Sequence, residues 1–227
     1  MNYVFDVDGT LTPSRGRVDS EFAEWFLQWS ENRNVFLVSG SDYAKTVEQL
    51  GEDICNGVDV VYSCAGNAVY MQGAMVSKSN FTITREQRLF LLDLLHNSEY
   101  HTRTGQHIEE RIGLCNFSVV GRGATPDQRR DYHIYDQITN ERFRLAASIN
   151  VMFPDLEATV AGETGIDIYR TGCDKSQIAD SVTPFVFFGD MIKPGGNDYS
   201  IAQLAHKYHC VNNWQDTWAI LQEKYND

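Results

Sequence analysis

The 227-residue chain has the composition of a globular protein, with 42% hydrophobic and 22% charged residues. Its formal net charge of −12 argues against a nucleic-acid partner, because phosphate backbones bind basic surfaces. No apolar run reaches the length of a membrane span, and the N-terminus lacks the regions of a secretory signal, so we expect no membrane contacts. The five cysteines form no CxxC pair, and we therefore expect a reduced, cytoplasmic protein.

The N-terminal part of the chain alternates predicted strands and helices. Apolar residues at Phe22, Phe26 and Trp29 have the spacing of an amphipathic helix. Strands separated by helices predict a parallel sheet, whose ligands bind beyond the carboxyl ends of its strands. The expected elements are strands at Asn2 to Phe5, Val35 to Val38 and Val58 to Tyr62, and helices at Asp19 to Trp29 and Asp42 to Leu50.

The pattern changes in the middle of the chain and then returns. The middle elements are expected to be a hairpin at Ala68 to Ser77, a helix at Arg85 to His96, an antiparallel pair at His107 to Val120, a polar helix-like stretch at Gln128 to Ile149, and strands at Glu157 to Ala161 and Gly165 to Tyr169. A strand at Phe185 to Phe188 and helices at Asn197 to Tyr208 and Asp216 to Lys224 follow. These elements predict an α/β protein with a Rossmann-like core at residues 1–80 and 172–227 and an inserted α+β cap at residues 81–171.

The first chemical signal is Asp6-Val7-Asp8-Gly9-Thr10, directly after the first predicted strand. Carboxylates two residues apart in an extended segment point to the same side, so Asp6 and Asp8 can face one pocket. Asp6 can attack a phosphoryl group to form an aspartyl-phosphate, and Asp8 can give a proton to the leaving oxygen and later take one from the incoming nucleophile. The alternative interpretation is that both are simple turn residues.

Two further segments offer groups that suit phosphate. Ser39-Gly40-Ser41 lies between a predicted strand and a predicted helix, where hydroxyl and backbone N–H groups can hold an anion. Lys175 can offset negative charge during phosphoryl transfer. Taken alone, the serine segment also fits an ordinary turn, and a lone lysine fits a solvated surface. The residues expected to hold the transferring phosphate are Thr10, Ser39, Gly40 and Ser41.

A further carboxylate, Asp190, follows the buried strand near the C-terminus. The carboxylates of Asp6 and Asp190, together with a backbone carbonyl, offer the hard oxygen ligands that Mg²⁺ prefers. The expected metal ligands are Asp6, Asp8 and Asp190. Asn197 and Asp198 are expected at outer positions around this metal, although Asp198 equally fits the cap of the following helix.

The order of these motifs resembles the haloacid dehalogenase superfamily. The resemblance implies that Asp6 is the nucleophile, that Asp8 is the general acid and base, and that Asp190 completes a Mg²⁺ site. A cap inserted between the serine segment and Lys175 resembles the C2 class of the superfamily, and here its C2b type.

The resemblance extends to the eukaryotic-type phosphomannomutases through FDVDGTLTPSRG, SGSDYAKTVEQLG, GLCNFSVVGR and FFGDMIKPGGND. That family interconverts mannose 6-phosphate and mannose 1-phosphate, and the resemblance implies a hexose 1,6-bisphosphate intermediate and activator and a homodimer formed through the cap. Arginine forks suit bidentate phosphate binding, although single arginines equally fit a solvated face. The substrate-binding residues that the resemblance implies are Arg15, Arg111, Arg122, Arg129 and Asp167.

Three features depart from the mutase pattern. Ser39 stands where the mutases usually have glycine, Gly165 replaces a substrate-binding serine, and the segment after Ser200 lacks an acidic, proline-containing loop that supports a further cation. Three functions therefore stay open. The leading one is a sugar-phosphate mutase; the second is a Mg²⁺-dependent sugar phosphatase, in which water replaces the sugar hydroxyl; the third is a catalytically silent binding module, against which the intact acidic motifs argue.

Overall fold

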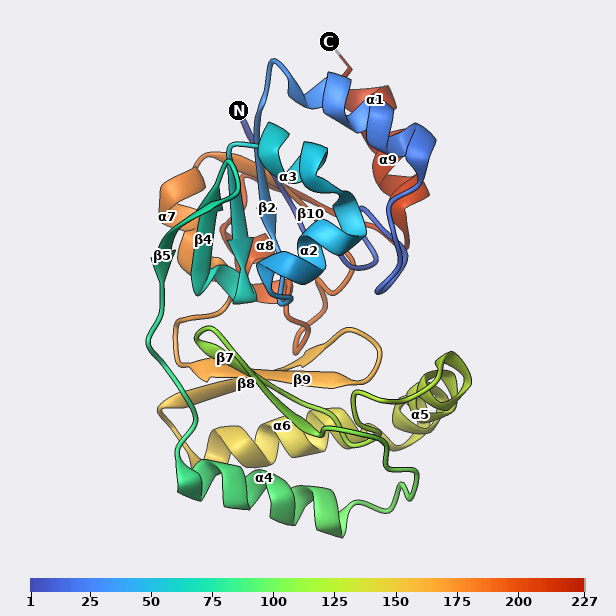
Figure 1. Ribbon diagram of the computed structural model, residues 1–227, viewed down its shortest axis with the longest axis vertical. Coiled ribbons are helices and arrows are strands. Elements are labelled where there is room, and N and C mark those ends of the chain that lie inside the picture. The colour runs from blue at the N-terminus through green and yellow to red at the C-terminus, as the bar shows by residue number, and fades with distance from the viewer. Residues whose placement is uncertain (227) are drawn as a thin grey trace.

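Two β-sheets organise the structure, a computed structural model that describes residues 1–226 (Figure 1). The larger sheet has the order β11-β10-β1-β2-β3-β4-β5, and its first five strands run parallel. Its strands are β1 (Asn2–Phe5), β2 (Asn34–Val38), β3 (Val60–Ser63), β4 (Ala68–Met71), β5 (Ala74–Lys78), β10 (Phe185–Gly189) and β11 (Lys207–Cys210).

Helices cover both faces of the larger sheet because its central strands are apolar on both sides. Phe5 and Phe188 stack at 4.8 Å on the face toward α1 and α9, and Val4 and Phe187 belong to the core on the opposite face. The helices of this part are α1 (Ser20–Ser30), α2 (Tyr43–Leu50), α3 (Glu52–Gly57), α7 (Ala179–Val182), α8 (Tyr199–Leu204) and α9 (Trp214–Lys224), with 3-10 turns η1 (Cys64–Gly66) and η2 (Lys175–Ile178).

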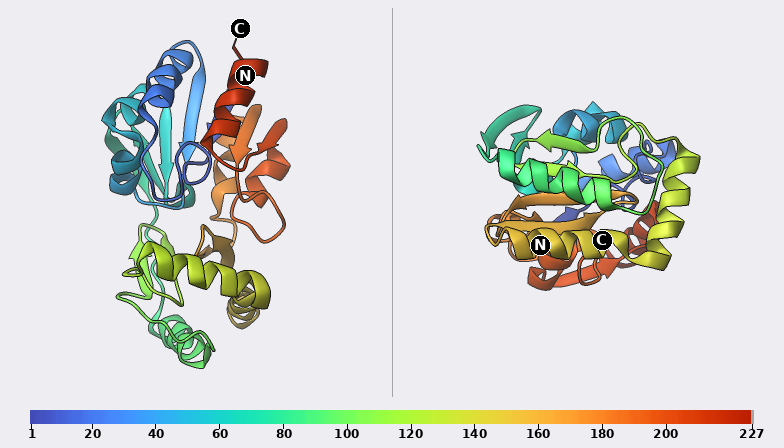
Figure 2. Two further views of the ribbon diagram at one scale, coloured as in Figure 1. Left: turned by 90° about the vertical axis from the view of Figure 1, so that its right-hand side faces the viewer. Right: turned by 90° about the horizontal axis from the view of Figure 1, so that it is seen from below.

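The smaller sheet is antiparallel, has the order β6-β7-β9-β8, and has its own core. Seen from below in Figure 2, α4 and α6 lie nearest the viewer, on the face turned away from the larger sheet. The other face of the smaller sheet points toward the carboxyl edge of the larger sheet. The elements are α4 (Arg85–Asn97), β6 (Ile108–Arg111), β7 (Leu114–Phe117), α5 (Pro126–Thr139), α6 (Glu141–Met152), β8 (Leu156–Ala161) and β9 (Gly165–Arg170).

The predicted fold class is confirmed, and two predicted elements are wrong. The helix expected at Asn197 to Tyr208 ends at Leu204, and the chain continues as β11, a largely exposed edge strand beside β10. The helix-like stretch from Gln128 to Ile149 consists of two helices, because Asn140 adopts a left-handed conformation with φ 53° and ends α5. Within residues 1–226, no helix has the length and apolar character that a membrane crossing needs.

Candidate active site

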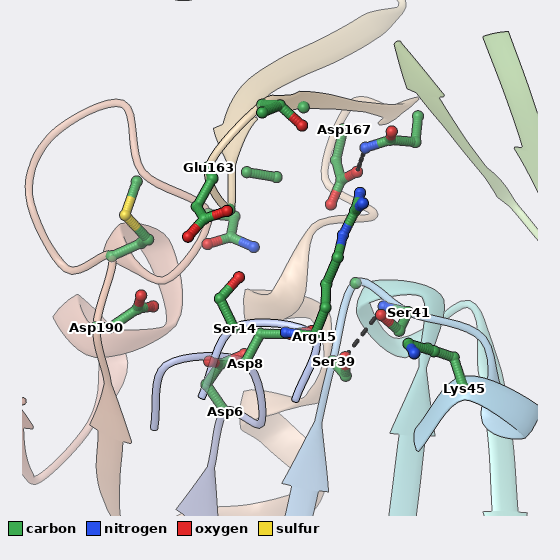
Figure 3. Close-up of a pocket in the computed structure, with 18 of the residues that line it drawn as sticks. Asp6, Asp8, Ser14, Arg15, Ser39, Ser41, Lys45, Glu163, Asp167 and Asp190 are labelled. Atoms are coloured by element: carbon green, nitrogen blue, oxygen red, sulfur yellow. Dashed lines mark hydrogen bonds between the residues drawn. The ribbon is translucent and has the colours of Figure 1, made fainter. Parts of the chain in front are cut away.

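Three adjacent parallel strands end at one pocket. Asp6 follows β1, Ser39 follows β2 and Asp190 follows β10, so the register of these strands brings the three side chains to the same sheet edge. Figure 3 shows Asp167, from β9 of the smaller sheet, on the opposite side of the pocket from Asp6 and Ser39. The pocket therefore lies between the two sheets.

Asp6 is held by a buried lysine at the floor of the pocket. Lys175 Nζ donates to Asp6 Oδ1 at 2.5 Å and to Asp198 Oδ1 at 2.7 Å, and Thr10 Oγ1 donates to Asp6 Oδ2 at 3.2 Å. Asp6, Lys175 and Asp198 are 4%, 1% and 0% exposed. Burial alone would lower the pKa of Lys175, but the two carboxylates outweigh it and hold that pKa above its ordinary value.

The acidic cluster fits a divalent cation. Carboxylate oxygens of Asp6, Asp190 and Asp198 lie within 4.8 Å of one another, and one lysine faces all three charges. Burial, followed by the neighbouring carboxylates, raises the pKa of Asp190 to about 9, and burial raises that of Asp6 to about 7 against the pull of Lys175. A hard cation would neutralise this excess of negative charge.

Not all of the predicted metal ligands belong to this acidic cluster. Asp6, Asp190 and Asp198 each offer an oxygen to the cluster, and Asp198 also accepts from Lys175 through Oδ1 and from the Met191 N–H at 3.1 Å through Oδ2. The carboxylate of Asp8 does not belong to the cluster found among residues 1–226. Asp6 and Asp190, the predicted carboxylate ligands, are thus placed to hold an ion, and Asp198 lies beside them in contact with Lys175.

Asp8 is oriented by neighbours of its own. Its Oδ1 accepts hydrogen bonds from the Arg15 backbone N–H at 2.6 Å and from Gln49 Nε2 at 3.0 Å. Both of these bonds go to one oxygen, which leaves Oδ2 to exchange a proton with a ligand in the pocket that Asp8 lines. Gln49 was not predicted as a site residue, although it lies in the SGSDYAKTVEQLG segment; the packing of α2 against the first loop places it here.

Gly9 is required by the space that Asp190 occupies. Its φ is +82°, and a Cβ at this position would lie 2.5 Å from Asp190 Oδ2.

We expect Gly9→Ala to displace Asp190 and remove most phosphotransferase activity. Gly51→Ala is the matched control, because Gly51 has φ +84° and open space around it. Both variants should lose about 1 kcal/mol of stability from backbone strain, measured by urea unfolding. Equal activity in the two variants would contradict this role.

The serine segment contacts residues of the smaller sheet. Ser39 Oγ, almost fully buried, accepts from the Ser41 N–H at 3.0 Å. The Gly40 carbonyl accepts from Arg111 Nη1 at 2.7 Å, and a Cβ on Gly40 would lie 2.6 Å from Asp167 Oδ2. Only a glycine lets the chain pass this close to Asp167. The predicted phosphate-binding segment is therefore also the place where the two sheets meet.

Three of the four predicted arginines, Arg15, Arg111 and Arg122, line the pocket, and Arg129 lines a neighbouring hollow together with Arg15. Burial lowers the pKa of Arg15 to about 10, and repulsion from Arg122, Arg129 and Arg111 adds to the shift. Two carboxylates pair with these arginines: Glu109 Oε2 contacts Arg111 Nη2 at 2.6 Å and Arg122 Nε at 2.9 Å, and Glu163 contacts Arg129 Nη2 at 2.5 Å. Such a cluster of cations in an acidic protein is suited to an anion.

Asp167 lies in one row with two residues that were not predicted as site residues. Glu109, Asn116 and Asp167 are cross-strand neighbours on β6, β7 and β9, and Asn116 Nδ2 donates to Asp167 Oδ1 at 2.7 Å. Burial raises the pKa of Asp167, although Arg111 and Asn116 oppose this. A Cβ on Gly165 would lie 2.6 Å from Asn116 Nδ2, so Asn116 occupies the space that a serine at position 165 would need.

Comparison with known proteins identifies the family. The family model of eukaryotic phosphomannomutase matches residues 22–227. The chain belongs to this family. The phosphomannomutase of Saccharomyces cerevisiae is 31% identical over 98% of the chain and 93% of its own length. Those of Galdieria sulphuraria and Dendrobium officinale are 31% and 30% identical, over 98% and 94% of the chain and 94% and 90% of their own lengths.

Solved structures with the same fold are more distant in sequence. A Plasmodium falciparum IMP-nucleotidase superposes with a TM-score of 0.68 at 13% identity, over 99% of this chain and 70% of that one. A haloacid dehalogenase subclass IIB sugar phosphatase superposes with a TM-score of 0.58 at 14% identity, over 97% and 98% of the two chains. These likenesses show the haloacid dehalogenase fold alone.

Proposed function

We propose that the protein is a phosphomannomutase that interconverts mannose 6-phosphate and mannose 1-phosphate through phosphorylated Asp6 and a hexose 1,6-bisphosphate. The observation that carries the proposal is that the predicted nucleophile and three of the predicted arginines line one pocket. Asp6, which Lys175 contacts, lines this pocket together with Arg15, Arg111 and Arg122. A bisphosphate that must present either end to one nucleophile needs both the nucleophile and the arginines.

The chemistry assigned to the residues follows from their positions. A sugar hydroxyl attacks the phosphorus on Asp6, the bond from phosphorus to the Asp6 oxygen breaks, and Asp8 takes the hydroxyl proton. The bisphosphate then reorients and its other phosphate is transferred to Asp6, while Asp8 returns the proton to the sugar oxygen that leaves. Lys175 holds the attacking carboxylate in place, and Arg15, Arg111, Arg122 and Arg129 hold the phosphate that is not reacting.

Mg²⁺ held by Asp6 and Asp190 would neutralise negative charge on the transferring phosphoryl group. We expect Mg²⁺ to raise the melting temperature in calorimetry, and a concentration near 100 Kd corresponds to about 2.7 kcal/mol. Asp190→Asn should lose most of this shift, whereas Asp180→Asn, an exposed change on α7, should keep it. A full Mg²⁺ shift in Asp190→Asn would rule out Asp190 as a ligand.

Residues 81–171 are proposed to act as a cap that opens and closes over the pocket. The pocket is lined from both sides, by Asp6 and Ser39 at the edge of the larger sheet and by Asn116 and Asp167 on the smaller one. A hexose phosphate bound there would contact both sides, so we infer that the two sides separate to admit it. Closure would then exclude water and protect the aspartyl-phosphate from hydrolysis. A cytoplasmic location and a homodimer through the cap stay predictions from composition and resemblance.

The test is an assay with Mg²⁺, mannose 1-phosphate and a trace of hexose 1,6-bisphosphate that follows mannose 6-phosphate and free phosphate together. Formation of mannose 6-phosphate in large excess over free phosphate is the expected result. Release of phosphate without isomerisation would overturn the proposal and indicate a sugar phosphatase. The same assay with glucose 1-phosphate measures the preference between the two hexoses.

A further inference from the structure

A buried ion pair outside the pocket joins α5 to α6. Arg142, in the first turn of α6, donates from Nε to Asp136 Oδ2 at 2.8 Å, and its backbone N–H donates to Asp136 Oδ1 at 2.8 Å. Each side chain is 5% exposed. The pair joins residues on either side of the bend at Asn140, so it fixes the relative orientation of the two helices.

The same guanidinium reaches the loop between β8 and β9. Arg142 Nη1 donates to the Gly162 carbonyl at 2.7 Å and lies 3.4 Å from the Gly165 carbonyl, so it contacts both ends of the turn. Residues 161–165 line the pocket, and Asp167 follows two residues later. Arg142 does not itself line the pocket among the described residues. It therefore acts on the pocket through this turn.

A second connection links the turn to α5. Arg129 Nη2 contacts Glu163 Oε2 at 2.5 Å, and His133 Nδ1 lies 3.3 Å from the Glu163 carbonyl oxygen. Arg129 belongs to the arginine cluster, and Asp136 lies two turns further along the same helix. The ion pair of Arg142 and Asp136 thus sets the distance between an arginine expected to bind phosphate and the turn that faces the sugar.

We propose that Arg142 is a positioning residue that holds the 162–165 turn and α5 in the geometry that binds the sugar phosphate. A buried ion pair is a poor source of net stability, because desolvation offsets most of its attraction. Its guanidinium fork contacts a carboxylate and two carbonyls at once, which the single ammonium of lysine cannot reproduce. The inference rests on the proposed substrate, and its test separates the two.

The first measurement is the Kd of mannose 1-phosphate by calorimetry in an Asp6→Asn background, where no turnover occurs. Arg142→Lys should weaken binding about 10-fold, because a shift of the 162–165 turn and of α5 moves the polar groups that contact the ligand away from it. Arg144→Lys, an exposed change on the same helix, should leave Kd unchanged. With Asp6 intact, Arg142→Lys should hydrolyse acetyl phosphate at the wild-type rate, since this small donor needs no contact with the cap.

The second measurement needs no ligand. Hydrogen exchange of the amides in residues 162–165 should be faster in Arg142→Lys than in Arg144→Lys, while the amides of β1 and β10 stay protected. An unchanged Kd, unchanged exchange in the turn, or a parallel loss of acetyl phosphate hydrolysis would overturn the positioning role. If mannose 1-phosphate fails to bind even the Asp6→Asn protein, the proposed substrate fails, and the exchange experiment still decides the role of Arg142.

Discussion

Replacing Asp6 with Asn is expected to reduce phosphoryl transfer by about 10⁴-fold or more, because the amide cannot form the acyl-phosphate bond. The measurement is the rate of mannose 6-phosphate formation, together with incorporation of labelled phosphate from acetyl phosphate into the protein. Neither should exceed background. Unchanged transfer in Asp6→Asn would contradict the proposed mechanism and direct attention to another nucleophile.

The same change should leave the fold intact. Asp6, Asp190 and Asp198 crowd three carboxylates around Lys175, so removing one charge relieves repulsion while Asp198 keeps its contact with the lysine. The melting temperature of Asp6→Asn without Mg²⁺ is therefore expected to equal or exceed that of the wild-type protein. A large fall in melting temperature would mean that the loss of activity reports unfolding.

Replacing Arg122 with Met should slow the reaction of mannose 1-phosphate much more than the hydrolysis of acetyl phosphate. A lost bidentate contact with phosphate is expected to lower kcat/KM for mannose 1-phosphate by about 100-fold. Hydrolysis of acetyl phosphate, which reaches only Asp6, should stay within about 2-fold of wild type, because the cap arginines contribute nothing to it. Parallel kinetics with both substrates provide the measurement, and the ratio of the two rates is the informative quantity.

Arg130→Met is the matched control for this variant. Arg130 lies on α5 next to Arg129, but its side chain is 66% exposed and pairs with Asp127 within the same helix. Such surface pairs contribute little, so both reactions should continue at wild-type rates. Equal losses in Arg122→Met and Arg130→Met would indicate that general positive charge on the cap matters, and would contradict a specific phosphate contact by Arg122.

The sequence predicts the floor of the site well because the relevant signals are local. Asp6, Ser39 and Asp190 each follow a short apolar run, and the ends of parallel strands meet at one sheet edge. The fold class follows from the same alternation of apolar strands and amphipathic helices. The role of each of these side chains stays a prediction, which the Asp6 and Asp190 variants test.

The contacts of the arginines could not be predicted, because they depend on pairing between distant elements. Glu109 meets Arg122 only through the hairpin that joins β6 to β7, and Glu163 meets Arg129 only because a turn packs against α5. The edge strand β11 was missed for a related reason. Its side chains are mostly exposed, so it lacks the alternation that marks a half-buried strand, and only pairing with β10 defines it.

The order of strands has a consequence for synthesis on the ribosome. β1 is central in its sheet, and one of its neighbours, β10, pairs Asn2 with Phe185. Until the last fifth of the chain emerges, β1 therefore has a bare apolar edge, while the four-stranded sheet already has all of its strands. An unpaired edge of this kind invites association with other chains. Nascent or truncated chains that stop before β10 should consequently depend on chaperones, although their cap can already fold.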